Sequence, residues 1–119
     1  MPDDIGVPDG DRPSAHDIAA RLLAFSEVRL KVFEPYGMTV NDIAWQLLLR
    51  CFVAHERGVR TTIYRLCNEL SVPKSASVRW LRALRGCGMV DYDDEAIGLS
   101  ATVRLTPAAE SSLRDLMEA

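Results

Sequence analysis

Apolar positions along the chain follow the period of amphipathic helices over five segments. These segments cover residues 14–34, 39–57, 61–70, 73–88 and 107–118. Met89–Tyr92 and Thr102–Leu105 instead have strand character, and the polar, glycine-containing segment between them is typical of a hairpin loop. The pattern therefore predicts a mostly α fold with a small β-hairpin.

Polar residues at the predicted helix starts have the spacing of N-terminal caps. The expected capping pairs are Ser14 with Asp17 and Thr39 with Asp42. Thr61 or Thr62 is expected to cap the third helix. Pro73 suits the first position of the fourth helix, because its missing N–H would have no helical partner there.

The length and composition predict one domain behind a short tail. A chain of 119 residues can bury a core without the help of disulfides or a metal. Residues 1–13 hold four Asp, three Pro and two Gly, which predicts a flexible acidic tail before a single domain over residues 14–119. The chain has no apolar run long enough to cross a membrane, its start is acidic, and its three cysteines are widely spaced. These features predict a cytoplasmic protein with no membrane partner.

Positive charge is concentrated in one part of a chain whose net charge is −3. Residues 57–90 contain six Arg and one Lys, but a single acidic residue, Glu69. Such a basic block inside an acidic protein indicates a surface for a polyanion. Charge alone is equally compatible with a solvated helix face.

The third and fourth helices and the hairpin have the order and lengths of a helix-turn-helix followed by a β wing. Residues 61–88 would form the helix-turn-helix and residues 89–105 the wing. In this arrangement Val72 anchors the turn, while Leu81 and Leu84 hold the fourth helix on the body. The first turn of that helix then faces outward with small and basic side chains that can approach a groove floor.

The run LCNELSVPKSASVRWLRALRGCGMV, the hairpin and the run VRLTPAAESSL resemble the winged helix-turn-helix domain of MarR-type transcriptional regulators. The resemblance covers roughly residues 37–117 and is strongest from Val72 to Leu81. It implies a homodimer that binds pseudo-palindromic DNA, with the fourth helix in the major groove and residues 14–34 and 107–118 as dimerisation helices. It also implies a small-molecule effector, bound between the dimer helices and the DNA-binding lobe.

Carried onto this sequence, the resemblance assigns eight candidate DNA-binding residues. The groove-facing residues would be Pro73, Lys74, Ser75, Ser77 and Arg79. Arg82 and Arg85 would reach phosphates from the flank of the helix, and Arg104 would partly replace a basic wing tip. A replacement is needed because Asp91–Gly98 contain four carboxylates and no basic residue, whereas the family usually has an arginine there. Ser71 also stands where a glycine is common in the turn.

Other kinds of chemistry find little support in the sequence. Trp45 and Trp80 have the spacing of core or interface residues rather than of ligand-stacking rings. The cysteines lie in apolar helical settings, which favours inert packing over oxidant sensing, with Cys87 the least buried by pattern. His16 and His55 lack partners at metal-ligand spacing, and the chain has no phosphate loop, nucleophile motif or calcium loop. We therefore expect no cofactor, no metal and no enzymatic activity.

Taken together, these features predict a sequence-specific transcriptional regulator with double-stranded DNA as its partner. The alternative is a winged helix that serves as a protein-interaction module without DNA binding, which the acidic tail and acidic wing favour. A third interpretation makes the tail an intramolecular competitor for the basic surface.

Overall fold

The computed structural model describes residues 14–39, 41–93 and 100–118. Its elements are α1 (Ala15–Phe33), the 3-10 helix η2 (Glu34–Tyr36), α2 (Asp42–Arg57), β1 (Thr61–Thr62), α3 (Ile63–Glu69), α4 (Lys74–Gly86), β2 (Val90–Asp91), β3 (Thr102–Leu105) and α5 (Pro107–Glu118). The mostly α fold with a small hairpin is confirmed. The predicted tail and the tip of the predicted wing, residues 94–99, lie outside the described residues.

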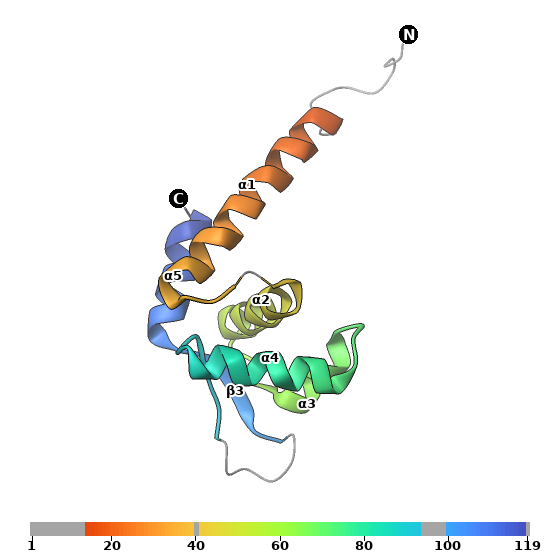
Figure 1. Ribbon diagram of the computed structural model, residues 1–119, viewed down its shortest axis with the longest axis vertical. Helices are drawn as coiled ribbons and strands as arrows, with labels where there is room; N and C mark the ends of the chain where they lie inside the picture. The colour runs from red at the N-terminus through yellow and green to blue at the C-terminus, as the bar shows by residue number, and fades with distance from the viewer. Residues whose placement is uncertain (1–13, 40, 94–99, 119) are drawn as a thin grey trace.

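The elements form a lobe from which the first helix projects. α2, α3, α4 and the sheet make up the lobe, and α1 runs beside α5 at one end of the molecule (Figure 1). Leucines of the lobe and of α5 form the largest group of fully buried side chains in the core. These are Leu47, Leu48, Leu66, Leu81, Leu84 and Leu113.

The sheet has three antiparallel strands in the order β1-β3-β2. β2 and β3 are the predicted hairpin strands, whereas β1 was not predicted. Thr61 pairs with Val103 of β3, and Thr62 both pairs with Thr102 and caps α3, its Oγ1 accepting a hydrogen bond from the Arg65 N–H at 3.1 Å. The capping prediction for Thr62 is therefore confirmed, and the hairpin strand β3 is joined through β1 to the start of α3.

The other helix starts agree with the sequence in part. Ser14 accepts a hydrogen bond from the Asp17 N–H at 3.1 Å, as predicted. The predicted cap at Thr39 is wrong, because Asn41 caps α2 instead, its Oδ1 accepting from the Ala44 N–H at 3.0 Å. Pro73 is the N-cap of α4 and not its first helical residue, since its backbone is still extended at ψ 142°.

The turn between α3 and α4 contains no left-handed residue. Among the described residues only glycines have positive φ angles, so Ser71 takes none of the strain expected where a glycine is common. The change of direction is instead spread over the extended residues Leu70 and Pro73.

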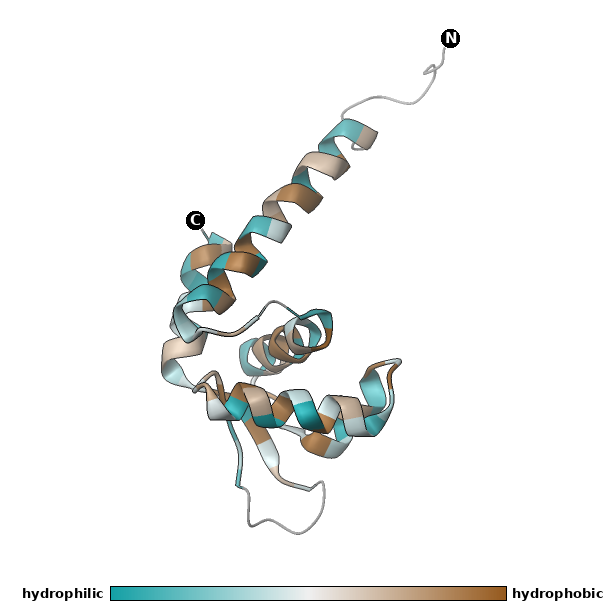
Figure 2. Cartoon of the chain, in the orientation of Figure 1, coloured by the Kyte–Doolittle hydropathy of each residue, from teal (hydrophilic) through white to brown (hydrophobic). Residues whose placement is uncertain are grey.

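α1 is apolar well beyond the turn that contacts the rest of the chain. Val32 and Phe33 in its last turn are buried, but Ile18, Leu22 and Phe25 are 46%, 61% and 55% exposed. Figure 2 shows hydrophobic positions continuing along the projecting part of the helix. Within the described residues, no helix combines the length and the hydrophobicity needed to span a membrane.

Candidate nucleic-acid interface

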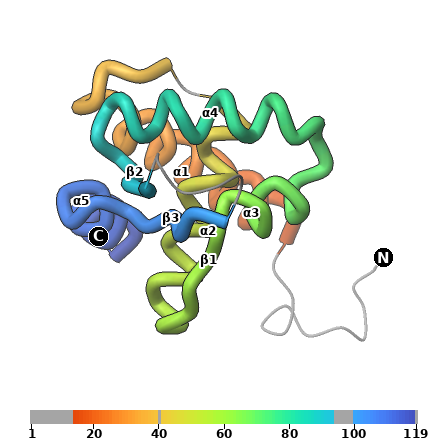
Figure 3. Tube along the Cα trace, turned by 90° about the horizontal axis from the view of Figure 1, so that it is seen from below, coloured from red at the N-terminus to blue at the C-terminus, as the bar shows by residue number. Residues whose placement is uncertain are grey.

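α4 has a buried stripe and an exposed stripe on opposite sides. The buried stripe consists of Ser77, Leu81 and Leu84. Ser75, Arg79 and Arg82 repeat the same spacing on the far side of the helix and are all exposed. Seen from below, α4 lies along one side of the lobe over its whole length, with β2 beside its C-terminal half (Figure 3). The exposed stripe is therefore presented outward by a helix that is anchored along its opposite face.

Ser77 does not face a groove, contrary to the prediction. Its side chain is 0% exposed, and its Oγ has no hydrogen-bond partner among the described residues. The reason is helical phase, because Ser77 precedes Leu81 by four residues and Leu84 by seven. A small residue at this position lets α4 pack closely on the core.

The other predicted groove-facing residues are exposed, and two of them rest on aromatic rings. Pro73, Lys74, Ser75 and Arg79 are all on the surface. The Lys74 Nζ lies 5.2 Å from the centre of the Tyr64 ring, and the Arg79 guanidinium 5.6 Å from that of Trp80. These contacts limit the motion of the two cations without neutralising them.

Tyr64 is a surface residue beside α4 that was not among the predicted site residues. It is 55% exposed on α3, beside the start of α4. An aromatic residue outside the apolar stripe of a short helix was the available signal. Its exposed ring therefore lies next to the first turn of α4.

Asp91 partly neutralises two cations at the base of the predicted wing. Asp91 of β2 lies 4.0 Å from the Arg85 Nε and 3.9 Å from a terminal nitrogen of Arg104. Arg104 is its direct cross-strand partner, and the Arg85 guanidinium also lies 5.0 Å from the ring centre of Tyr92. Arg82 differs from both, because it makes no ion pair with any described residue. Asp91 therefore lowers the positive potential at the end of α4 but not along its exposed stripe.

The tryptophans and thiols are packing residues. Trp45 and Trp80 are partly buried against the core, and the Trp45 ring meets Phe33 edge-on with centroids 6.3 Å apart. Burial raises the pKa of the Cys51 thiol to about 12 and also raises the pKa values of the Cys67 and Cys87 thiols. The thiols therefore stay protonated near neutral pH and are weak nucleophiles.

His55 has acidic neighbours that its sequence context did not reveal. Its Nε2 lies 3.9 Å from Glu110, and these two residues with Glu56 form the one group in the described part of the chain with the closeness of metal ligands. Arg114 forms ion pairs with both glutamates, and its Nε donates a hydrogen bond to Glu110 at 2.8 Å. The guanidinium already supplies the positive charge that these carboxylates need, and it ties α5 to α2.

Comparison with known proteins gives structural matches only. No family model and no curated protein matches the sequence. The fold is similar to that of reduced HlyU from Vibrio cholerae, at 20% identity and a TM-score of 0.53, covering 85% of this chain and 94% of the other. It is also similar to that of NadR in complex with 4-hydroxyphenylacetate, at 18% identity and a TM-score of 0.54, covering 99% of this chain and 77% of the other. The transcriptional regulator PA4135 matches at 22% identity and a TM-score of 0.52, covering 90% of this chain and 78% of the other.

These matches confirm at the level of the fold the resemblance to winged-helix regulators. The chain therefore has a winged-helix fold, with the consecutive helices α3 and α4 followed by the antiparallel pair β2 and β3 of a three-stranded sheet. Because the sequence identities are 22% and below, the matches do not identify the binding partner of this chain, which has to be inferred from its own residues.

Proposed function

We propose that this chain is a transcriptional regulator that binds duplex DNA with α4 in the major groove. The observation that carries the proposal is the exposed stripe of α4, in which Arg79 and Arg82 face away from a buried stripe and have no carboxylate partner among the described residues. Lys74 and Ser75 extend this surface to the start of the helix, where backbone N–H groups favour a phosphate. The proposed activity is binding and involves no chemical step.

The proposed binding species is a homodimer joined through α1 and α5. Ile18, Leu22 and Phe25 lie on the same face of α1 as the buried Val32. This apolar face is therefore buried by the rest of the chain at the C-terminal end of the helix and exposed to solvent toward its N-terminal end. Met117 on the adjacent α5 is also exposed, at 39%. A second copy can cover both faces and set two recognition helices at the spacing of a two-fold DNA site.

Binding is expected to be strongly dependent on salt. Arginine and lysine contacts to phosphate release counterions, so the logarithm of the association constant falls with that of the salt concentration by about 0.9 for each phosphate contact. A fluorescence anisotropy titration with random duplex at low salt, followed by selection of bound sequences from a random pool, tests the proposal. No binding at micromolar protein would favour a protein-interaction module instead.

Replacing Asp91 with Asn is expected to tighten duplex binding by about three- to tenfold at low salt. The change removes a negative charge that lies within 4.0 Å of the Arg85 Nε and faces Arg104 across the strands. The gain in affinity should shrink as salt is added. Asp91 and its arginine partners are exposed, so salt screens both their ion pairs and the repulsion between Asp91 and DNA phosphates. Asp115→Asn, an exposed site on α5, is the matched control, and an equal gain in that variant would mean that only net charge matters.

A small-molecule effector is also proposed, since the similar protein NadR was solved in complex with 4-hydroxyphenylacetate. The sequence resemblance implies a site between the dimer helices and the DNA-binding lobe. The structure also contains a basic groove elsewhere in the lobe.

A further inference from the structure

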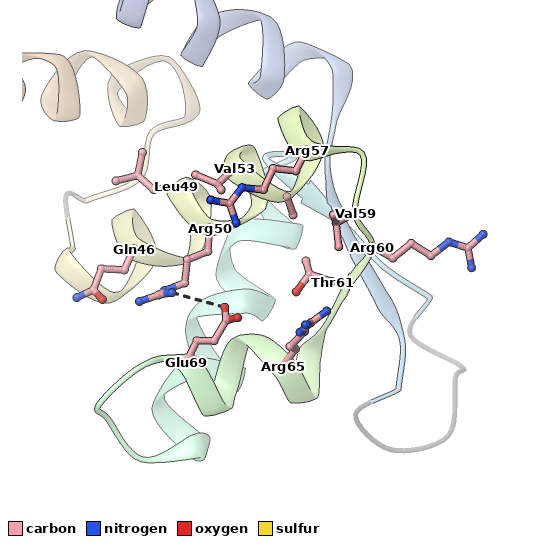
Figure 4. A pocket seen from close by; sticks show the side chains of 11 residues that line it. Gln46, Leu49, Arg50, Val53, Arg57, Val59, Arg60, Thr61, Arg65 and Glu69 are labelled. Carbon is pink, nitrogen blue, oxygen red and sulfur yellow. Dashed lines mark ion pairs between the residues drawn. The ribbon is translucent and has the colours of Figure 1, made fainter.

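An open groove of about 500 Å³ lies between α2, β1 and α3. Four arginines line it, two from α2, one from the residue before β1 and one from α3. These are Arg50, Arg57, Arg60 and Arg65. Figure 4 shows Arg50, Arg57 and Arg65 around the hollow, whereas the Arg60 side chain extends away from it. Its volume is within the range of small-molecule sites.

The charge of the groove is not balanced by its own residues. Glu69 is the only carboxylate among the described residues that line it, and it lies 3.6 Å from Arg50. Arg57 and Arg65 have no ion pair with any residue in the described ranges. Two guanidinium groups on separate helices, around one hollow, can bind an anion with little rearrangement of the backbone.

Apolar side chains lie among these cations. Leu49, Val53 and Val59 line the groove, and Val53 and Val59 are 46% and 49% exposed. Inorganic phosphate gains no free energy from contact with these apolar side chains. An anion with an apolar body, in contrast, would remove their surface from water. The combination therefore favours an amphipathic ligand over an inorganic ion or a nucleic-acid backbone.

We propose that this groove binds a small organic anion with an apolar body, of the size of an aryl carboxylate. The carboxylate would lie between Arg57 and Arg65, and the apolar body would cover Val53 and Leu49. The site is built from one protomer and has no residue of α1, α4 or α5, which sets it apart from both the DNA surface and the cleft between the end helices.

The groove is connected to the proposed DNA surface through β1. Thr61 lines the groove and pairs with Val103 of the wing strand, while the next residue caps α3. An anion that draws α2 and α3 together would therefore act on the elements that position the wing and the turn before α4. This regulatory consequence rests on the proposed function, whereas ligand binding does not.

The test is calorimetric titration of the full chain with phenylacetate and with acetate. Phenylacetate is expected to bind at least about tenfold more tightly than acetate, because only its ring can cover the apolar wall. Arg57→Gln with Arg65→Gln should weaken phenylacetate binding by at least about tenfold, and Val53→Asn should remove the advantage of phenylacetate over acetate. Lys31→Gln, at an exposed position on α1 away from the groove and from α4, is the matched control and should bind phenylacetate like the wild type.

Equal affinity for the two acids, or an equal loss in Lys31→Gln, would overturn the proposal. Inorganic phosphate that binds more tightly than phenylacetate, with no effect of Val53→Asn, would also overturn it and indicate a phosphate-backbone contact. Duplex affinity is measured separately with each variant. Anion binding without duplex binding would refute only the proposed DNA-binding function. Duplex binding without anion binding would refute only the proposed anion site in the groove.

Discussion

Removing both guanidinium groups from the exposed stripe of α4 is expected to weaken duplex binding by about a hundredfold or more. In Arg79→Ala with Arg82→Ala, each change removes a charged contact worth about 1–3 kcal/mol at a DNA surface. Neither residue makes a carboxylate ion pair in the described part of the chain, and both are exposed, so the melting temperature should change little. The affinities can be compared by fluorescence anisotropy at one fixed salt concentration.

The two single variants should differ in kind. Arg79 is nearer the start of α4 and is expected to contact a base edge, so Arg79→Ala should relax discrimination at one base-pair position. Arg82 is expected to contact phosphate, so Arg82→Ala should weaken all sequences alike and lower the salt slope by about 0.9. Lys31→Ala removes a positive charge from an exposed site on α1 and serves as the control. Wild-type affinity in Arg79→Ala would count against the proposed docking of α4.

Placing a carboxylate in the apolar face of α1 is expected to convert the dimer into a monomer. Phe25 lies in the open part of this face and is 55% exposed in the single chain, so Phe25→Asp should leave the lobe folded. In a dimer the same side chain would be buried, and an unpaired carboxylate in an apolar interface is strongly unfavourable. Sedimentation or gel filtration should show the mass halved.

The same variant should lose about a hundredfold or more in affinity for a two-half-site duplex, while its binding to a single half-site changes little. The difference arises because linked half-sites raise the effective concentration of the second recognition helix. Ala20→Asp introduces the same charge at an exposed position on the opposite side of α1 and should remain dimeric. A wild-type protein that sediments as a monomer at micromolar concentration would refute the proposed interface.

Local features of this fold were predictable from the sequence. The helices, the cap at Ser14 and the two hairpin strands depend on residues within a few positions of one another, and the structure has them where the patterns indicate. The wrong predictions at Thr39 and Pro73 move the first residues of α2 and α4, but both helices are present as predicted. The prediction that Ser77 faces a groove is wrong, because its helical phase with Leu81, a relation the sequence contains, places its side chain in the core.

The sequence by itself determined which segments are helical, where positive charge gathers and that α1 is apolar along most of its length, because periodicity and composition are local properties. Only the tertiary structure decided that β1 pairs with β3, that Asp91 faces two arginines, and that arginines of α2 and α3 surround one groove. These features join residues far apart in the chain, and their positions follow from how the helices pack on a shared core. Side-chain surroundings that arise from packing cannot be inferred from spacing along the chain.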